Sequence, residues 1–272
     1  MLLTLEQKQN LLEIMLNAAQ KASKLQIEKF RQPFQISQKS SHTDLVTEVD
    51  IASQKIIIDS VTEGCLKAGF DEDKIGFIGE ENVDSQKELT FIIDPLDGTS
   101  NYAIGFEYFS ILIALYTENE IQIGLVYYPI GETYYRSIKD QGSFKVDKSG
   151  VEKKLLIKPK KLSESILVSN LDGFLMFKNN FIRSLRGKRM IYGVGLELAL
   201  ITEGIFDIQL NDHPHLWDIA GLTLIIKEAG GIFVDFKGVE VNLDMRNISK
   251  TYQTLVCHPD LLESVINGFD KV

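Results

Sequence analysis

The chain opens with an apolar pattern that is typical of a long amphipathic helix. Apolar residues recur at three- and four-residue steps, and Thr4 and Gln7 have the spacing of a capping box. This pattern predicts a helix over residues 5–30. A polar stretch with a proline follows over 31–43 and predicts a loop or loose hairpin. A second helix is expected over 48–63, before Gly64.

The pattern then changes to the short apolar runs that are typical of strands. Residues 90–93 form such a run and end abruptly in Asp94-Pro95, as expected of a buried strand. Two β-rich runs at 108–116 and 121–128 are separated by four polar residues, which predicts a hairpin. Residues 132–138 add a third antiparallel strand.

The second half of the chain alternates strands with helices. A lysine-rich stretch over 145–161 has no strong pattern and is expected to be a surface connection between two halves. We therefore divide the chain into an N-terminal α+β half, 1–150, and a C-terminal α/β half, 151–272, which form one unit of stacked helix and sheet layers. Strands are expected at 166–169, 190–192, 206–209, 231–234 and 254–257, and helices at 196–203, 217–229 and 259–267.

Composition supports a globular protein with a large core. The chain has 272 residues, of which 44% are hydrophobic and 25% are charged. Its two cysteines, Cys65 and Cys257, form no CxxC pair, so we expect reduced thiols and a cytoplasmic location. A secretory segment and a run of 18 apolar residues are both missing from the sequence, so no membrane association is expected.

The net charge narrows the possible partners. A formal charge of −9 and a pI near 5.1 argue against a broad nucleic-acid surface, which would need a cationic face. An acidic protein that binds an anionic substrate must reverse the sign of the charge locally. Bound divalent metal ions do this most directly.

Carboxylates at the edges of apolar elements supply the candidate chemistry. Asp44, Glu80, Asp94, Asp97 and Asp218 each lie beside an apolar run rather than on an evident solvated face. Carboxylates that gather at the ends of buried elements repel one another unless a proton or a cation neutralises them. Because ligation by oxygen alone selects hard ions, the pattern indicates Mg²⁺.

The segment from Asp94 to Thr99 combines a cation site with an anion site. The proline after Asp94 favours an extended backbone, so a strand should end with this carboxylate at its tip. Asp97 can point into the same cavity, and the Leu96 carbonyl is a neutral ligand. Gly98 and Thr99 can present N–H groups to a phosphate if a helix begins there.

Several motifs together make the sequence resemble the inositol monophosphatase family of lithium-sensitive, Mg²⁺-dependent phosphatases. The resemblance covers nearly the whole chain and implies a layered α-β-α-β-α fold, commonly as a homodimer. The matching segments are Asp44-Leu45-Val46-Thr47 with Asp50, Ile78-Gly79-Glu80-Glu81, residues 92–101, Trp217-Asp218-Ile219-Ala220-Gly221 and Glu228-Ala229-Gly230-Gly231.

The resemblance also implies roles for individual residues. Glu80, Asp94 and the Leu96 carbonyl would bind a first Mg²⁺. Asp94, Asp97 and Asp218 would bind a second, and Glu80 would touch a weaker third. Asp44 and Thr99 would orient the attacking water, and the backbone of Gly98 and Thr99 would hold the phosphate. Two such ions, ~4 Å apart, activate a water and stabilise an in-line displacement.

The sequence departs from the family where the substrate's alcohol would bind. Asn211 stands where inositol-directed members have a glutamate that contacts the sugar hydroxyls. Residues 192–197, which include Gly195, replace the usual Gly-Ser-Ala-Ala-Leu-Asp stretch of the pocket wall. The leading hypothesis is a phosphatase for a small, inositol monophosphate-like metabolite, and a phosphatase for NADP or adenosine 3′,5′-bisphosphate is the alternative. A catalytically silent metal- or partner-binding relative is the alternative from a different class.

Overall fold

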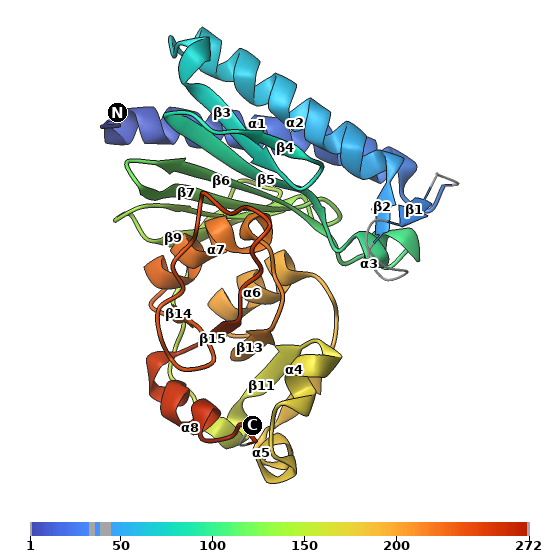
Figure 1. The fold of residues 1–272 in the computed structure, drawn as a ribbon, viewed down its shortest axis with the longest axis vertical. Helices are drawn as coiled ribbons and strands as arrows, with labels where there is room; N and C mark the ends of the chain where they lie inside the picture. The colour runs from blue at the N-terminus through green and yellow to red at the C-terminus, as the bar shows by residue number, and fades with distance from the viewer. Residues whose placement is uncertain (1, 33–35, 39–44, 271–272) are drawn as a thin grey trace.

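Helices and sheets alternate in five layers along the long axis of the molecule (Figure 1). The computed structural model describes residues 2–32, 36–38 and 45–270. Two long helices cover one face of a large sheet, a pair of helices packs on its other face, and a smaller sheet and several short helices follow. The expected α-β-α-β-α fold is confirmed.

The outer layer consists of α1 (Leu5–Lys29) and α2 (Glu48–Lys67). Thr4 caps α1 as predicted, because its hydroxyl accepts the Gln7 N–H at 3.2 Å while its own N–H donates to the Gln7 side chain at 2.9 Å. The prediction that the second helix ends before Gly64 was wrong. A Cβ at Gly64 would lie 2.7 Å from Cγ2 of Ile14, so this glycine allows the two helices to approach closely.

The large sheet has eight strands in the order β10-β9-β8-β7-β6-β5-β3-β4. The predicted hairpin and third antiparallel strand are confirmed as β6, β7 and β8. The surface connection expected over 145–161 instead contains the end of β9 and the whole of β10, which pair antiparallel. The strands are β3 (Ile75–Gly79), β4 (Val83–Ser85), β5 (Leu89–Asp97), β6 (Ser110–Thr117), β7 (Glu120–Tyr128), β8 (Thr133–Ile138), β9 (Ser143–Val146) and β10 (Glu152–Lys154).

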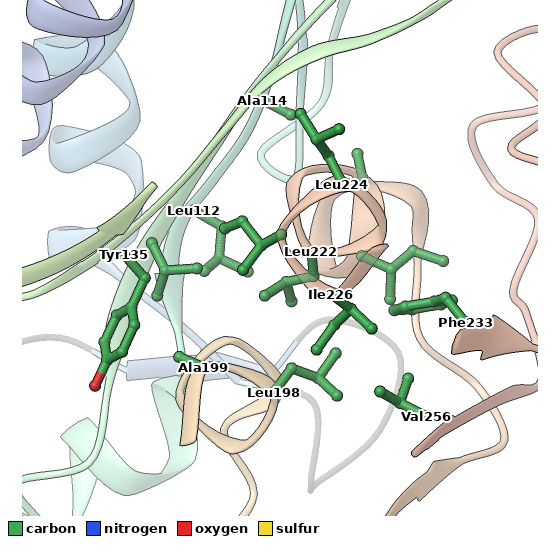
Figure 2. Packing of buried hydrophobic residues seen from close by; sticks show 14 of the residues in the cluster. Leu112, Ala114, Tyr135, Leu198, Ala199, Leu222, Leu224, Ile226, Phe233 and Val256 are labelled. Atoms are coloured by element: carbon green, nitrogen blue, oxygen red, sulfur yellow. The ribbon is translucent and has the colours of Figure 1, made fainter. Parts of the chain in front are cut away.

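The middle layer, α6 (Val194–Thr202) and α7 (Leu216–Glu228), is apolar because it is covered on both sides. Figure 2 shows Leu222 and Ile226 of α7 between Leu112 of the large sheet and Val256 of the smaller one. Burial of such side chains stabilises the fold by ~1.5–3 kcal/mol each. This packing on both sides fixes the positions of α6 and α7 relative to the two sheets.

The smaller sheet has the order β12-β11-β13-β15-β14. The strand expected at 190–192 lies instead at 187–189, because Tyr192 has a φ of 59° and cannot continue an extended chain. The strands are β11 (Ile166–Ser169), β12 (Gly187–Arg189), β13 (Ile208–Asn211), β14 (Ile232–Val234) and β15 (Thr254–Cys257).

Short elements complete the fold. The helix expected over 259–267 is divided into the 3-10 turn η3 (Pro259–Leu261) and α8 (Leu262–Ile266). None of the helices in the described part of the chain combines the length and apolar character needed to cross a membrane. The remaining elements are β1 (Ile36–Gln38) and β2 (Leu45–Thr47), which pair antiparallel, α3 (Thr99–Ala103), α4 (Leu171–Leu175), α5 (Asn179–Ser184), η1 (Glu72–Lys74) and η2 (Leu162–Glu164).

Candidate active site

A bulge in β5 places two carboxylates on the same face of the large sheet. Asp94 pairs with Leu112 of β6 and Asp97 pairs with Ser110, so three steps on β5 correspond to two on its partner. Residues three apart on a regular strand point to opposite faces, but the extra residue returns Asp97 to the face of Asp94. The predicted strand end at Asp94 was therefore wrong, because the strand continues through Pro95 to Asp97.

These two carboxylates are buried and held by the backbone around them. Asp94 is 3% exposed and accepts the Leu96 N–H at 3.0 Å. Asp97 is 6% exposed and accepts the Ser110 hydroxyl at 2.7 Å and the Gly195 N–H at 3.0 Å. Burial raises the pKa of Asp97 to about 6, although these hydrogen bonds oppose the rise.

Glu80 and Asp218 reach the same cavity from neighbouring elements. Glu80 directly follows β3, which is parallel to β5, so its backbone lies beside Ile93. Asp218 lies in the first turn of α7, where its carboxylate accepts the His215 N–H at 2.7 Å. The cavity has a volume of about 370 Å³, and its wall also includes Leu96, Gly98, Thr99, Asn170, Tyr192, Gly193, Val194, Glu197, Asn211 and His213.

Helix α3 begins at the edge of this cavity, which meets the condition that the sequence left open. Gly98 is its N-cap and has a φ of 86°, and a Cβ at this position would lie 2.9 Å from the Tyr108 carbonyl oxygen. Only glycine fits both requirements. The first N–H groups of α3 therefore lie beside the carboxylates, where an anion could accept them.

Thr99 has a buried partner that the sequence did not reveal. Its hydroxyl lies 2.9 Å from the Asp50 carboxylate and 2.9 Å from the Leu96 carbonyl. Asp50 is fully buried in the first turn of α2. It belongs to the same motif as Asp44, which was the only signal available. Asp44 itself lies outside the described residues.

The opposite wall of the cavity is held by Asn101 and Glu197. The Asn101 side-chain nitrogen lies 2.8 Å from the carbonyls of both Ile191 and Tyr192, and 2.9 Å from that of Tyr108. The Glu197 carboxylate accepts backbone N–H groups from Gly193 and Tyr192. Two side chains thus fix a backbone segment whose left-handed residue, Tyr192, would otherwise be unfavourable.

Asn211 lies on the wall of the same cavity, whereas Gly195 lies outside the wall and contacts it through Asp97. A Cβ at Gly195 would lie 2.4 Å from Leu112 and 2.9 Å from the Asp97 carboxylate, so this contact requires glycine. Asn211 ends β13 and is half-buried, and its side-chain oxygen accepts the His213 N–H at 3.4 Å.

The electrostatics of the cavity fit a hard divalent cation. Burial raises the pKa of Asp94 well above its ordinary value, and the negative charges of Glu80, Asp97 and Asp218 raise it further. No three carboxyl, imidazole or thiol groups among the described residues converge as a ready-made metal cage. Mg²⁺ typically takes one or two carboxylates and keeps several waters, so an open cavity lined with oxygen donors suits it.

Comparisons with known proteins cover nearly the whole chain. A profile of the inositol monophosphatase family matches residues 7–267. Inositol monophosphatase 3 of Solanum lycopersicum is 32% identical over 254 residues, which cover 88% of this chain and 91% of that protein. The solved structure of an IMPase from Thermotoga maritima has a TM-score of 0.82 at 24% identity and covers 94% of this chain and 95% of its own.

A second solved structure shows the fold with ions present. It is an IMPase/NADP phosphatase complexed with Mg²⁺ and phosphate, with a TM-score of 0.77 at 21% identity, covering 97% of this chain and 98% of its own. The family profile and the curated relative both span most of the sequence, and the fold agrees with that of the two solved structures. This chain belongs to the inositol monophosphatase family.

Proposed function

We propose that this protein is a Mg²⁺-dependent phosphomonoesterase that hydrolyses a small phosphorylated metabolite. The observation that carries the proposal is the bulge in β5. It brings Asp94 and Asp97 to one cavity with Glu80 and Asp218, beside the first N–H groups of α3. Acidic groups for a cation and N–H donors for a phosphate thus meet in one place.

The proposed roles follow the positions of the side chains. Glu80, Asp94 and the Leu96 carbonyl would hold one ion. Asp94, Asp97 and Asp218 would hold a second, and Glu80 would also contact a third. Bound Mg²⁺ supplies the positive charge that activates a water and stabilises the leaving oxygen. Thr99, with Asp44, would orient that water, and the N–H groups of Gly98 and Thr99 would hold the phosphate.

For the alcohol part of the substrate we propose an inositol monophosphate-like polyol. NADP or adenosine 3′,5′-bisphosphate is the second candidate, and Asn211 is the observation that favours it. An amide at this wall can pair with the edge of a base, whereas a carboxylate would suit paired hydroxyls better. Tyr192, about half exposed on the same wall, adds an aromatic surface.

The test is a phosphate-release panel with and without Mg²⁺. It covers inositol 1-phosphate, NADP, adenosine 3′,5′-bisphosphate and fructose 1,6-bisphosphate. We expect release that depends on the metal, with one compound clearly preferred. Absence of metal-dependent release from every compound would favour the silent-relative hypothesis. Inhibition by millimolar lithium is expected from family membership and can be measured in the same assay.

We also propose that residues 1–150 and 151–272 work as one unit, because both halves contribute to the cavity wall. A homodimer is expected from the family resemblance. Sedimentation of the purified protein at micromolar concentration tests it, and a single monomeric species would contradict it.

A further inference from the structure

One side of the candidate active site carries polar residues to which the proposed metal and phosphate chemistry gives no role. Asn170 and His213 both line the cavity on this side. Asn170 directly follows β11, and His213 lies two residues beyond the end of β13. Because β11 and β13 are parallel neighbours, their carboxyl ends meet at the same edge of the smaller sheet. The two side chains therefore come to the cavity wall from adjacent strands.

A single buried carboxylate, that of Asp212, connects these two side chains. Asp212 is 9% exposed and directly precedes His213 in the chain. One of its carboxylate oxygens accepts the side-chain N–H of Asn170 at 2.8 Å. The other oxygen lies 2.9 Å from Nδ1 of His213. Both oxygens are thus engaged by residues of the cavity wall, so Asp212 fixes the two relative to each other.

These contacts determine which atoms remain for a ligand. A carboxylate only accepts, so Nδ1 of His213 carries the shared proton, and Nε2 of the neutral ring is an acceptor. No described residue hydrogen-bonds to Nε2, and the His213 side chain is 74% exposed. Asn170 uses its oxygen to accept the Gly173 N–H at 2.8 Å and one N–H for Asp212. Its second amide N–H bonds to none of the described residues and remains a donor.

A donor and an acceptor on one wall suit a hydroxyl group, which both accepts and donates hydrogen bonds. A phosphate group would use donors only, and an apolar group would use neither. The candidate substrates share this chemistry. Inositol 1-phosphate, NADP and adenosine 3′,5′-bisphosphate all carry a free hydroxyl on the ring that bears the phosphate to be removed.

We propose that Asn170 and His213 bind a free hydroxyl of the alcohol that is released, and that Asp212 is the positioning residue that orients both. This inference rests on the proposed function. The competing explanation is that Asp212 only joins the ends of β11 and β13. The two strands are already joined by their ladder and by the Ser169 hydroxyl, which donates to the Leu210 carbonyl at 2.7 Å. Pairing of a carboxylate with an exposed imidazole adds little to stability.

Steady-state kinetics with matched pairs of substrates, at saturating Mg²⁺, test the proposal. Inositol 1-phosphate is compared with cyclohexyl phosphate, which has the same ring without hydroxyls. Adenosine 2′-phosphate is compared with its 3′-deoxy analogue, and the pair whose hydroxylated member is hydrolysed faster is used. The variants are Asp212→Ala, Asp212→Asn and His213→Ala. Asp260→Ala is the matched control, because Asp260 also lies beside a histidine, 3.6 Å from Nδ1 of His258, but does not line the cavity.

We expect Asp212→Ala and His213→Ala to raise KM for the hydroxylated substrate about five- to tenfold, the effect of one or two lost hydrogen bonds, with kcat changed less than ~2-fold. The kinetics of the substrate without the hydroxyl should stay within ~2-fold of those of the unmodified protein, and so should both substrates with Asp260→Ala. Asp212→Asn offers one acceptor to two donors, so it should raise KM less than Asp212→Ala does.

Circular dichroism and thermal melting verify that each variant folds, and His213→Ala, at an exposed position, keeps the test open if Asp212→Ala does not. An equal loss of kcat/KM for both members of a pair would reduce Asp212 to a structural role and overturn the proposal. An unchanged KM for the hydroxylated substrate in an active protein would also overturn it, and would leave the proposed function intact. No turnover of any compound by the unmodified protein would overturn the proposed function and this inference together.

Discussion

Asp94 is the residue through which the proposed metal binding is linked most directly to the fold. Its carboxylate is buried among three other acidic groups, so its negative charge is unfavourable unless a cation is present. The Asp94→Asn variant keeps the shape and the acceptor for the Leu96 N–H but removes the charge. We expect it to lose more than ~99% of Mg²⁺-dependent phosphate release.

The same substitution should not destabilise the metal-free protein. Removing one charge from a crowded acidic site relieves repulsion, so the melting temperature in EDTA should stay equal or rise. Asp59→Asn, at an exposed position on α2, serves as the control. If Asp94→Asn keeps more than a few per cent of turnover, the metal role proposed for Asp94 is wrong.

The buried Glu197 carboxyl group should make the stability of the native state depend on pH. Burial raises its pKa from 4.5 to about 8, and the charge of Asp97 adds to the rise. The native state therefore holds this proton more tightly than the unfolded state does. The resulting stability is complete below the unfolded pKa and is lost as the pH rises through the folded pKa. We expect the melting temperature of the metal-free protein to fall between pH ~4.5 and ~8 and to level off above that range.

The Glu197→Gln variant tests this cause. An amide does not titrate, so the variant should show a shallower fall over the same pH range. Asp94 and Asp97, whose pKa values are also raised, would keep part of the slope. Glu164→Gln, at an exposed position, should follow the unmodified protein. Identical slopes in all three proteins would exclude Glu197 as the titrating group.

Asn211 is the residue on which the proposed substrate preference depends most directly. Asn211→Glu introduces the carboxylate that the family resemblance implies for inositol-directed members. We expect the ratio of kcat/KM for inositol 1-phosphate over NADP to rise about tenfold or more, since two hydroxyls can then donate to one side chain. Lys188→Gln changes an exposed residue of β12 that does not line the cavity and is the control. An unchanged ratio would mean that Asn211 does not contact the alcohol.

At the scale of elements, the least predictable feature was the bulge in β5. Apolar residues at 90–93 correctly indicated a buried strand, and Pro95 suggested that it ends. The strand continues because Ser110 and Leu112 of β6 pair with both sides of the bulge. Such a partner is distant in sequence, so local propensity cannot reveal it. Contacts with residues distant in sequence also explain two other differences. Helix α2 continues past Gly64, where it packs on α1, and the expected strand at 190–192 is interrupted at Tyr192, whose carbonyl is held by Asn101.

A pair of glycines positions Asp218 through the packing of α7 on β7. A Cβ at Gly124 of β7 would lie 2.3 Å from the Gly221 carbonyl oxygen, so helix and strand touch backbone to backbone. Gly124→Ala must push α7 outward, and Asp218 lies one turn from the contact. We expect a loss of ~1–3 kcal/mol in the free energy of unfolding and weaker activation by Mg²⁺.

The control for this variant is Gly187→Ala. A Cβ at Gly187 would meet its nearest atom at 3.5 Å, which is an ordinary contact. Chemical denaturation gives the stability, and phosphate release at increasing Mg²⁺ concentration gives the activation. A Gly124→Ala protein with normal stability and normal Mg²⁺ dependence would show that α7 does not need this close contact.

At the scale of the whole molecule, the sequence predicted the main layers and the carboxylates better than the connections between them. Helix α1, the β6–β7 hairpin and β15 follow strong apolar patterns and were predicted closely. Strands β4 and β10 are three residues long with mostly exposed side chains, so no apolar pattern marks them. The hydrogen bond from the Thr99 hydroxyl to Asp50 likewise depends on packing between segments that are distant in sequence, and the spacing of residues in a motif does not reveal such packing.

The cavity joins the two halves, so the proposed metal binding would be a property of the whole fold. Asp218 comes from α7, whereas Glu80, Asp94 and Asp97 come from the large sheet. An ion that binds only the native arrangement stabilises it by mass action, by ~2.7 kcal/mol at 100 times its Kd. We expect Mg²⁺ to raise the melting temperature well above that in NaCl of equal ionic strength.

The Asp218→Asn variant separates this effect from general charge screening. The amide oxygen can still accept the His215 N–H, so the start of α7 is preserved. Because one half then offers the ion a neutral group, we expect most of the Mg²⁺-dependent rise in melting temperature to disappear. The rise in NaCl alone should remain. A variant that keeps the full Mg²⁺ effect would show that the ion is held by the first half alone.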